Sequence, residues 1–343
     1  MDGQKHRIAT EGDANGEKAG FYVGHLDGHP AGYIKNNRTG LDMRWKSKGY
    51  ALDPQEKAKI QAEAAGKLEA RAIEQERTHE QTAQRVSKQL GELVPIIAAT
   101  PYLQTKGIAP QSGIFTDKAG QTTYVPANDA DGKIWTMQYI REDGTKRFAK
   151  DSHKEGTFHV VGGGGMEALA KAPALAIGEG YATAGSLSEV LGFATVAAFD
   201  SGNVPAVAKA LHEKFPDKPV VIFGDDDKHL EQTEGVNPGR KKAEEAAKAV
   251  GGTVLLPIFA PGEQSRDPKG FTDFNDLANK STLGKEGVER QAKAAVSMAI
   301  EKRQASQATL EQNQTQTQRN TQTRQGQRTP RQERPPKALR LRR

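Results

Sequence analysis

The sequence predicts an α/β fold class: a parallel sheet with helices on both faces, preceded by a small α+β region. Continuous apolar strands alternate with amphipathic helices over residues 174–277, which is typical of a doubly covered parallel sheet. Short strands with alternating polarity precede it over residues 114–150, which is typical of an antiparallel meander. A long polar helical stretch lies before these regions, and a polar basic segment follows them, so we also expect a connector helix and a disordered basic C-terminal tail.

Composition limits the protein class. The 343 residues suggest about two domains, and only 35% are hydrophobic, with a mean hydropathy of −0.71. No apolar run approaches the ~20 residues that span a bilayer, and no signal peptide follows Met1. Cysteine is absent, which excludes disulfides, cysteine zinc sites and a cysteine nucleophile. We therefore expect a cytoplasmic protein without a membrane partner.

Residues 1–50 are predicted to form a small N-terminal β element. Residues 21–26 and 31–34 have the pattern of two strands, joined by a turn at Asp27-Gly28. Basic residues surround Tyr33 and Trp45. Such a mixture can stack bases and contact phosphates, but Trp45 can equally cap a very small core.

Residues 51–94 are predicted to form the connector helix, which begins at Pro54 with Asp53 as its N-cap and ends near Leu93. The segment is rich in Ala, Glu, Gln, Lys and Arg, and its apolar positions are sparse. We interpret it as a solvated arm, with a partner-binding helix as the alternative.

Residues 95–172 are predicted to form the α+β region. A short helix ends at Gly107, and Asp131-Gly132 is the hairpin turn of the meander. The expected strands are 114–115, 123–126, 133–140 and 146–150. The run Gly162 to Gly165 lacks the Gly-Lys-Ser/Thr of a phosphate-binding P-loop, so we interpret it as a hinge.

Residues 173–285 are predicted to form the parallel sheet and its helices. The expected strands are 174–177, 195–199, 219–223 and 253–257, and the expected helices are 181–191, 204–215 and 239–250. In such sheets the functional groups gather at the carboxyl ends of the strands.

Acidic residues follow these strand ends. Glu179 follows the first strand, and Asp225, Asp226 and Asp227 follow the third. Asp225 and Asp227 face one side of an extended segment, and Asp226 faces the other. Because carboxylate oxygens are the ligands that Mg²⁺ prefers, the pattern predicts a magnesium site at this edge.

These residues carry a family resemblance. Glu179, then Gly202-Asn203, then Asp225-x-Asp227 resemble the Toprim domain of primases, topoisomerases and related nucleases. Residues 102–108, 125–134 and 146–148 look like the catalytic core that precedes Toprim in bacterial-type primases, closest to the plasmid and phage primases that are often fused to relaxases or helicases. Residues 271–278 resemble the Asp-rich segment that closes the Toprim unit. The resemblance covers residues 95–280 well and residues 21–50 loosely.

The resemblance implies a DNA primase that makes short RNA primers on single-stranded plasmid DNA from ribonucleoside triphosphates. It implies that Asp225, Asp227 and Asp276 hold Mg²⁺, or Mn²⁺ in its place, with Glu179 as a further ligand or a proton acceptor. Asp273 either joins this patch or is a helix N-cap. The cysteine-rich zinc module of such primases is absent, so no zinc is expected.

The remaining candidates contact substrates. Arg147, Lys150, Lys154 and Asn203 are predicted to bind nucleotide or DNA, although each basic residue taken singly can equally be a solvated surface charge. His229 is either near the metal or a plain exposed histidine.

Two other functions stay open. A Toprim nuclease or nicking enzyme shares the acidic triad but needs no upstream core, and a non-catalytic single-stranded DNA-binding module of a conjugation protein needs no acids. A topoisomerase needs a nucleophilic tyrosine in a separate cleavage domain, for which there is no room. A plasmid relaxase or helicase is the expected partner protein.

Residues 286–343 are predicted to form a terminal helix and the basic tail. Residues 302–343 carry eleven Lys/Arg and two Asp/Glu, a net charge of +9, which leaves about −3 on residues 1–301. A disordered basic arm attracts polyanions by counterion release. The alternative is a solubilising terminus or a linker.

Overall fold

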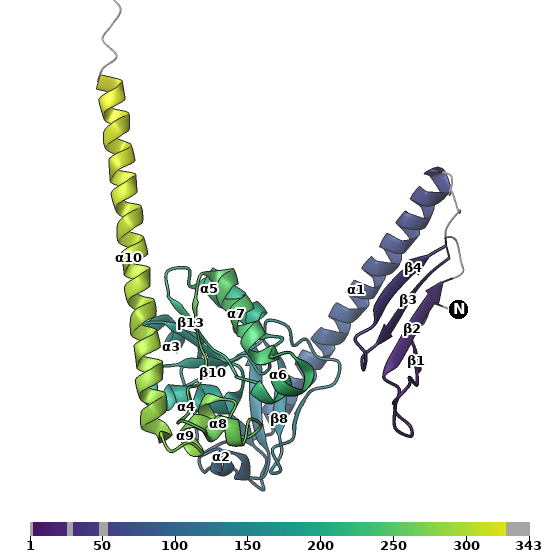
Figure 1. Cartoon of the computed structure of the whole chain (residues 1–343), viewed down its shortest axis with the longest axis horizontal. Helices are drawn as coiled ribbons and strands as arrows, with labels where there is room; N and C mark the ends of the chain where they lie inside the picture. The colour runs from purple at the N-terminus through teal and green to yellow at the C-terminus, as the bar shows by residue number, and fades with distance from the viewer. Residues whose placement is uncertain (1–2, 26–29, 48–53, 327–343) are drawn as a thin grey trace, which may run out of the picture. The chain divides into compact units, whose positions relative to one another are not determined.

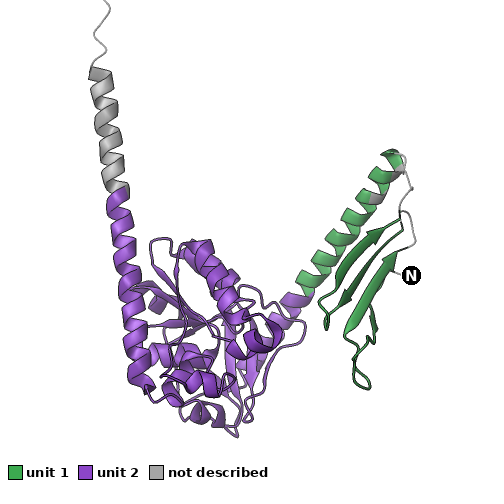
Figure 2. Ribbon diagram, viewed as in Figure 1, with its two compact units in different colours: residues 1–77 green, residues 78–343 purple. Residues whose placement is uncertain are grey.

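The computed structural model describes residues 3–25, 30–47 and 54–326. The chain divides into two compact units, residues 1–77 and residues 78–343 (Figure 2). The division falls inside helix α1 (Pro54–Leu90). The predicted turn at Asp27-Gly28 and the predicted N-cap Asp53 lie outside the described residues.

The described part of the first unit contains a four-stranded antiparallel sheet in the order β1-β2-β3-β4 (Figure 1). Its strands are β1 (His6–Ile8), β2 (Gly20–His25), β3 (Ala31–Asn36) and β4 (Asp42–Lys46). Tyr33 pairs with Val23 on one side and with Arg44 on the other. The expected small β element is present, and its sheet includes a first strand that the sequence pattern did not indicate.

Helix α1 is exposed over its first turns and buried near its end. Leu68 and Ile73 are 63% and 64% exposed, as expected for a solvated arm. The expectation of an exposed helix is wrong further on, because Thr82, Ala83 and Val86 are buried. The residues at positions 82, 83 and 86 lie on one side of the helix. They span only about one helical turn, and so short a stretch does not show an amphipathic pattern in the sequence.

The second unit begins with a small antiparallel sheet in the order β5-β6-β7-β8-β9. The strands are β5 (Val94–Pro95), β6 (Phe115–Thr116), β7 (Thr123–Asn128), β8 (Ile134–Ile140) and β9 (Lys146–Phe148), and helix α2 (Pro101–Thr105) lies between β5 and β6. Thr100 caps α2 by accepting a hydrogen bond from the Leu103 amide. The meander therefore forms as its alternation predicts, and we call it the small sheet.

A second five-stranded sheet follows, in the order β10-β12-β11-β13-β14. Its strands are β10 (His159–Val161), β11 (Leu175–Gly178), β12 (Thr195–Ala197), β13 (Val220–Phe223) and β14 (Thr253–Leu255). The last four pair in parallel as predicted, but β10 pairs antiparallel with β12, so the sheet is mixed. The three-residue strands β12 and β14 were recognised within predicted strands of five residues, whereas β10 runs directly into the glycines of residues 162–165 and shows no such pattern.

Helices cover both faces of this mixed sheet (Figure 1). Leu175 and Ile177 of β11 face one core, with α3 (Gly165–Lys171), α5 (Val204–Lys214) and α7 (Pro238–Val250). Ala174 and Ala176 are on the opposite core. There they lie against α4 (Tyr181–Leu191), α9 (Phe274–Asn279) and α10 (Gly284–Gly326). The remaining short helices are α6 (Lys228–Glu234) and α8 (Glu263–Arg266).

The small sheet packs against the mixed sheet. A third core joins Val125, Ala127 and Ile140 of the small sheet to Tyr181 and Phe199 of the mixed-sheet region. Gly162 to Gly165 all have positive φ, and they carry the chain from β10 into α3, a helix that the sequence pattern did not indicate. The two sheets thus belong to one compact unit.

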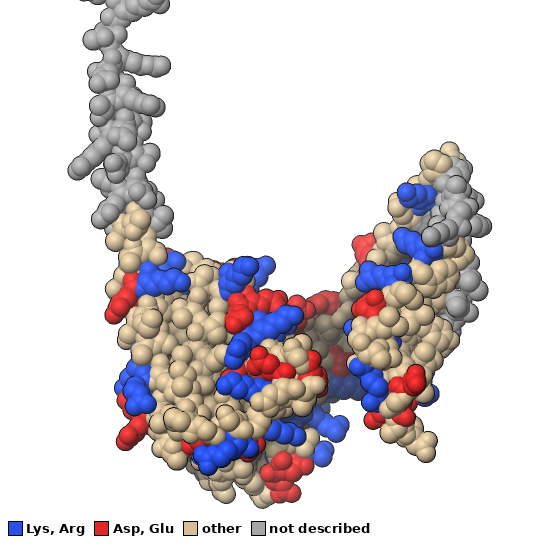
Figure 3. Space-filling model, viewed as in Figure 1, with Lys and Arg blue, Asp and Glu red and all other residues tan. Residues whose placement is uncertain are grey.

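Helix α10 extends to Gly326 and so includes residues 302–326 of the segment expected to be disordered. Gln, Arg and Ala are good helix formers, which explains how a helix can continue there without an apolar face. Residues 327–343 lie outside the described residues. On the face drawn in Figure 3, acidic and basic side chains are interspersed on the second unit, consistent with the small net charge before residue 302. Among the described helices none is long and apolar enough to cross a membrane.

Candidate active site

The predicted acidic residues meet at one edge of the mixed sheet. Strands β11 and β13 are parallel neighbours, and Gly178 pairs with Phe223, so the segments that follow them leave the sheet side by side. Glu179 follows β11 directly, and Asp225 and Asp227 follow β13. The expectation that Glu179, Asp225 and Asp227 lie together is therefore met, and we call them, with Asp273, the acidic cluster.

Helix α7 holds the Asp225–Asp227 segment tightly. The Gly239 amide donates a hydrogen bond to Oδ2 of Asp227 at 2.9 Å, and the Asp227 amide donates to Oδ1 of Asn237 at 3.1 Å. A Cβ at Gly239 would lie 2.6 Å from the Asp225 carbonyl oxygen, so only glycine permits this approach. The position of Asp227 is therefore fixed by backbone packing.

Asp226 points away from the cluster, as the strand alternation predicts. Its carboxylate accepts hydrogen bonds from Asn237 at 2.8 Å, Arg240 at 2.9 Å and Gln264 at 3.1 Å. Burial alone would raise the pKa of Asp226, but these hydrogen bonds outweigh it and lower the pKa. Asp226 is thus a buried, fully paired carboxylate that holds the loop after β13.

Asp225 and Glu179 differ from Asp226, because their pKa values are raised and not lowered. Burial first, and then the charges of Glu179 and Asp273, raise the pKa of Asp225 well above its ordinary value. Burial and the nearby charge of Asp227 raise the pKa of Glu179 to about 7. Oδ1 of Asp225 is buried and has no hydrogen-bond partner among the residues that the structure describes. The positive charge near these carboxylates does not offset their burial and mutual repulsion, and a bound cation would do so.

Asp273 takes the helix N-cap role that was one of its two predicted alternatives, whereas the carboxylate of Asp276 is paired within the protein. Asp273 caps α9 by accepting a hydrogen bond from the Asp276 amide at 2.7 Å, and burial and the charge of Asp276 raise its pKa. Asp276 was predicted as a metal ligand. Its Oδ1 pairs with Lys280 at 2.8 Å, and its Oδ2 accepts from the Thr272 amide at 3.1 Å. Both Asp276 oxygens are engaged within the protein, so the structure favours Asp273 over Asp276 as the fourth member of the acidic cluster.

The side chains of the acidic cluster would have to move to hold a metal ion. Over the described ranges 3–25, 30–47 and 54–326, no three His, Asp or Glu side chains form a ready coordination group. The donor set nevertheless fits a hard cation, since it consists of carboxylate oxygens and includes the unpartnered Oδ1 of Asp225. Mg²⁺ commonly binds through one or two carboxylates and keeps its other ligands as water or phosphate.

Lys146 of the small sheet is a basic neighbour that sequence reasoning missed. The charges of Asp273, Asp225 and Glu179 act to raise its pKa, but burial of the ammonium and the charge of Lys106 outweigh them and lower it. The residue as a whole is nevertheless exposed to solvent. Its Nζ lies 5.7 Å from the centre of the Tyr102 ring. The small sheet therefore brings a cation to the acidic cluster, although only Arg147, the next residue, was singled out from the sequence.

The three predicted basic residues lie in different places. Lys154 forms an ion pair with Asp200 at 2.7 Å, and the charge of Asp200 also acts on Glu179, so Lys154 belongs to the surroundings of the cluster. Arg147 lines a separate hollow together with Lys150. The side chain of Lys150 is exposed and lies 4.0 Å from Asp151. The largest charges that act on Glu179, Asp225 and Asp273 come from neighbouring carboxylates and, for Asp273, from Lys106 and Lys146.

Asn203 is not placed to bind nucleotide. Its Nδ2 donates to the carbonyl oxygens of Thr157 and Ala198, both at 2.8 Å, and its Oδ1 accepts from the Gly156 amide at 2.7 Å. The side chain is buried. It ties the chain before β10 to the chain after β12, so the structure assigns it a positioning role in the fold. His229 is half-buried, and its Nδ1 has no hydrogen-bond partner.

Comparison with known proteins agrees with this geometry. Residues 174–283 match the Toprim domain family. Two proteins from Escherichia coli, each named DNA primase TraC, are 59% and 57% identical to the chain over 88% and 87% of its length. The matches cover 33% and 24% of those proteins, so the chain spans a third or less of these curated relatives.

Solved primase structures give weaker matches. The Aquifex aeolicus primase (zinc binding and RNA polymerase domains) has a TM-score of 0.41 and 17% identity, covering 81% of this chain and 79% of that one. The DnaG primase catalytic domain bound to ssDNA has a TM-score of 0.38 and 16% identity, and the match covers 65% of this chain and 83% of that one.

Proposed function

Since residues 174–283 form a Toprim domain, we propose that this chain carries the catalytic part of a DNA primase that makes short RNA primers on single-stranded plasmid DNA. The observation that supports it best is the acidic cluster, in which the buried Asp225 Oδ1 has no partner and Glu179 has a pKa of about 7. The small sheet supplies Lys146 beside it. The similarity to the two primases named above supports the same reaction.

The reaction is phosphoryl transfer, in which positioning and charge neutralisation provide most of the catalysis. Asp225 and Asp227 would hold Mg²⁺, with Glu179 and Asp273 as further acids beside Asp225. A bound Mg²⁺ neutralises phosphate charge and lowers the pKa of an attacking hydroxyl.

The chain's own residues do the remaining work. Glu179 lies beside Asp225 and Asp227 and would accept the proton of the attacking 3′-hydroxyl as a general base. Lys146 and Lys106 place positive charge where the triphosphate would lie. Ribonucleoside triphosphates and a single-stranded template are the proposed substrates, and a plasmid relaxase or helicase in the cytoplasm is the proposed partner.

The test is incubation of the full chain with circular single-stranded DNA, Mg²⁺ and labelled ribonucleotides. We expect labelled oligomers from the wild-type chain and none from the double variant Asp225→Asn, Asp227→Asn. The matched control is Glu213→Gln, an exposed carboxylate on α5 that lies 3.9 Å from Lys209, and it should synthesise normally.

Two outcomes would overturn the proposal. Nicked DNA without synthesis would indicate the nuclease. Near-normal synthesis by the double variant would show that the acidic cluster is not the active site.

A further inference from the structure

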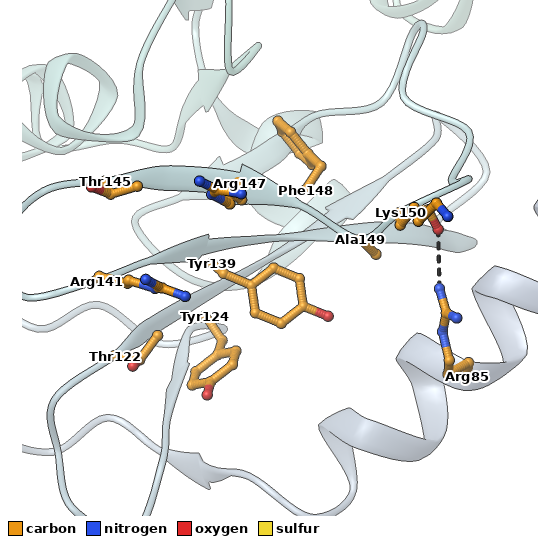
Figure 4. A pocket seen from close by; sticks show the side chains of 10 residues that line it. All are labelled: Arg85, Thr122, Tyr124, Tyr139, Arg141, Thr145, Arg147, Phe148, Ala149 and Lys150. Atoms are coloured by element: carbon orange, nitrogen blue, oxygen red, sulfur yellow. Dashed lines mark hydrogen bonds between the residues drawn. The ribbon is translucent and has the colours of Figure 1, made fainter.

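The small sheet carries a hollow of about 540 Å³ that is separate from the acidic cluster. Its main side chains are Arg85, Tyr124, Tyr139, Arg141, Arg147 and Lys150 (Figure 4). Arg85 comes from the end of α1, and the others come from β7, β8, β9 and the chain that follows β8 and β9. All of them belong to the second compact unit.

Strand register explains why these side chains gather. Tyr124 pairs with Tyr139, and Tyr139 pairs with Arg147, so the three form a row across β7, β8 and β9 on one face. Lys146 and Phe148 alternate to the other face, where Phe148 packs on Phe199 at 5.2 Å between ring centres. The row thus faces away from the acidic cluster.

The two tyrosine rings are held in place and partly open to solvent. Their centres are 5.5 Å apart and the ring planes are inclined by 72°. The Tyr139 hydroxyl donates a hydrogen bond to Oε1 of Gln89 on α1 at 2.8 Å. Both rings are half-buried, so part of each aromatic surface remains accessible.

The charge of the hollow is entirely positive. Three arginines and one lysine line it, with no Asp or Glu among the lining residues. Arg85 is held by the hydrogen bond it donates to the Lys150 carbonyl oxygen at 3.0 Å (Figure 4). Within the described part of the chain, Arg141 and Arg147 have no carboxylate at ion-pair distance, so their guanidinium groups are available to an anionic ligand.

We propose that this hollow binds a segment of single-stranded DNA, with bases stacking on Tyr124 and Tyr139 and phosphates contacting Arg85, Arg141 and Arg147. Stacking surfaces inside a basic groove are how proteins bind single strands without sequence preference. A duplex hides its base faces, so the rings favour a single strand. The choice of DNA rests on the proposed function, whereas the aromatic and basic chemistry does not.

The test is fluorescence anisotropy of a labelled thymidine oligomer with the full chain, titrated at several salt concentrations. Tyr124→Leu should weaken binding about tenfold, the effect of removing about one stacked base. Tyr124→Phe keeps the ring and should bind like wild type. Equal weakening in the two variants would refute stacking, because the hydroxyl or the fold would then be responsible.

The arginines are tested by salt dependence. The double variant Arg141→Gln, Arg147→Gln should lower the slope of log affinity against log salt by about 1.4, or about 0.7 for each phosphate that is no longer neutralised. Arg290→Gln, an exposed arginine on α10, is the matched control and should leave the slope unchanged. An unchanged slope in the double variant would overturn the site.

Two further measurements separate this inference from the proposed function. The variants should lose more affinity for the single strand than for a duplex of equal length, and an equal loss would refute a single-strand site. Excess ATP should not displace the oligomer; displacement would show a mononucleotide pocket instead. Binding needs no synthesis, so if the variants weaken binding as expected and the wild-type chain makes no primers, only the primase is refuted.

Discussion

Replacing Glu179 by Gln should stabilise the metal-free protein at pH 8 and have little effect at pH 5. Glu179 has its pKa raised from 4.5 to about 7 by burial and by Asp227. The native state therefore binds this proton more tightly than the unfolded state does, and stability falls as pH rises from about 4.5 to about 7. The difference corresponds to about 3 kcal/mol above pH 7, as an order of magnitude for a carboxyl that interacts with its neighbours.

Glutamine keeps a side-chain oxygen that can accept the hydrogen bond from the Ser201 amide, so the substitution removes mainly the charge. For a unit of this size, about 3 kcal/mol corresponds to a rise in Tm of about 5–10 °C. The assay is thermal unfolding of wild type and Glu179→Gln in EDTA at pH 5 and pH 8, with Glu213→Gln as the exposed control. Adding Mg²⁺ at pH 8 should raise the wild-type Tm and narrow the gap between the two proteins. An equal gap at both pH values, or no gap at pH 8, would refute the argument from burial and repulsion.

Three further predictions concern other parts of the chain. Asn203→Ala should lower the unfolding free energy by about 3 kcal/mol, because buried backbone groups lose their partners, and a Tm shift under about 2 °C would contradict this. Within α1, limited proteolysis should cut residues 54–77 before residues 82–90, where Ala83 and Val86 are buried; a first cut of α1 at or after Thr82, identified by mass spectrometry, would be inconsistent with that packing. Removing residues 307–343 should lower the slope of log DNA affinity against log salt by about 0.7 for each phosphate that this segment neutralises, and synthesis at saturating template should survive. An unchanged slope would show that this segment does not contact DNA.

The sequence determined the main sheet and the position of its acids. Continuous apolar strands such as β11 and β13 can be stable only when both faces are covered, so their pattern predicts a parallel sheet with helices. Parallel neighbours end at the same edge, so Glu179 and the Asp225–Asp227 segment had to meet there. The alternation within that segment also predicted that Asp226 would face the other way, as its bonds to Asn237 and Arg240 confirm.

Local pattern was insufficient where a residue's partner comes from a distant part of the chain. Asn203 and Asp276 both match the sequence pattern that predicted the site. Their side chains are instead hydrogen-bonded within the protein, Asn203 to the Thr157 carbonyl oxygen and Asp276 to the Thr272 amide. The antiparallel strand β10 is joined to the sheet through its pairing with β12, and this long-range pairing leaves no local signal in the sequence. No sequence signal could distinguish these polar groups from ligands, because their hydrogen-bond partners are fixed only by folding.

Lys146 and Arg147 show most clearly what only the tertiary structure decided. Adjacent residues in a strand must face opposite sides, so the sequence alone established that these two cations separate. Which of them meets the acids depends on which face of the small sheet packs against the mixed sheet. The face that carries Val125, Ala127 and Ile140 packs against the mixed sheet, because burying these apolar side chains removes the most apolar surface from water. Lys146 is thereby brought to the acidic cluster, and Arg147 is left on the face with the two tyrosines.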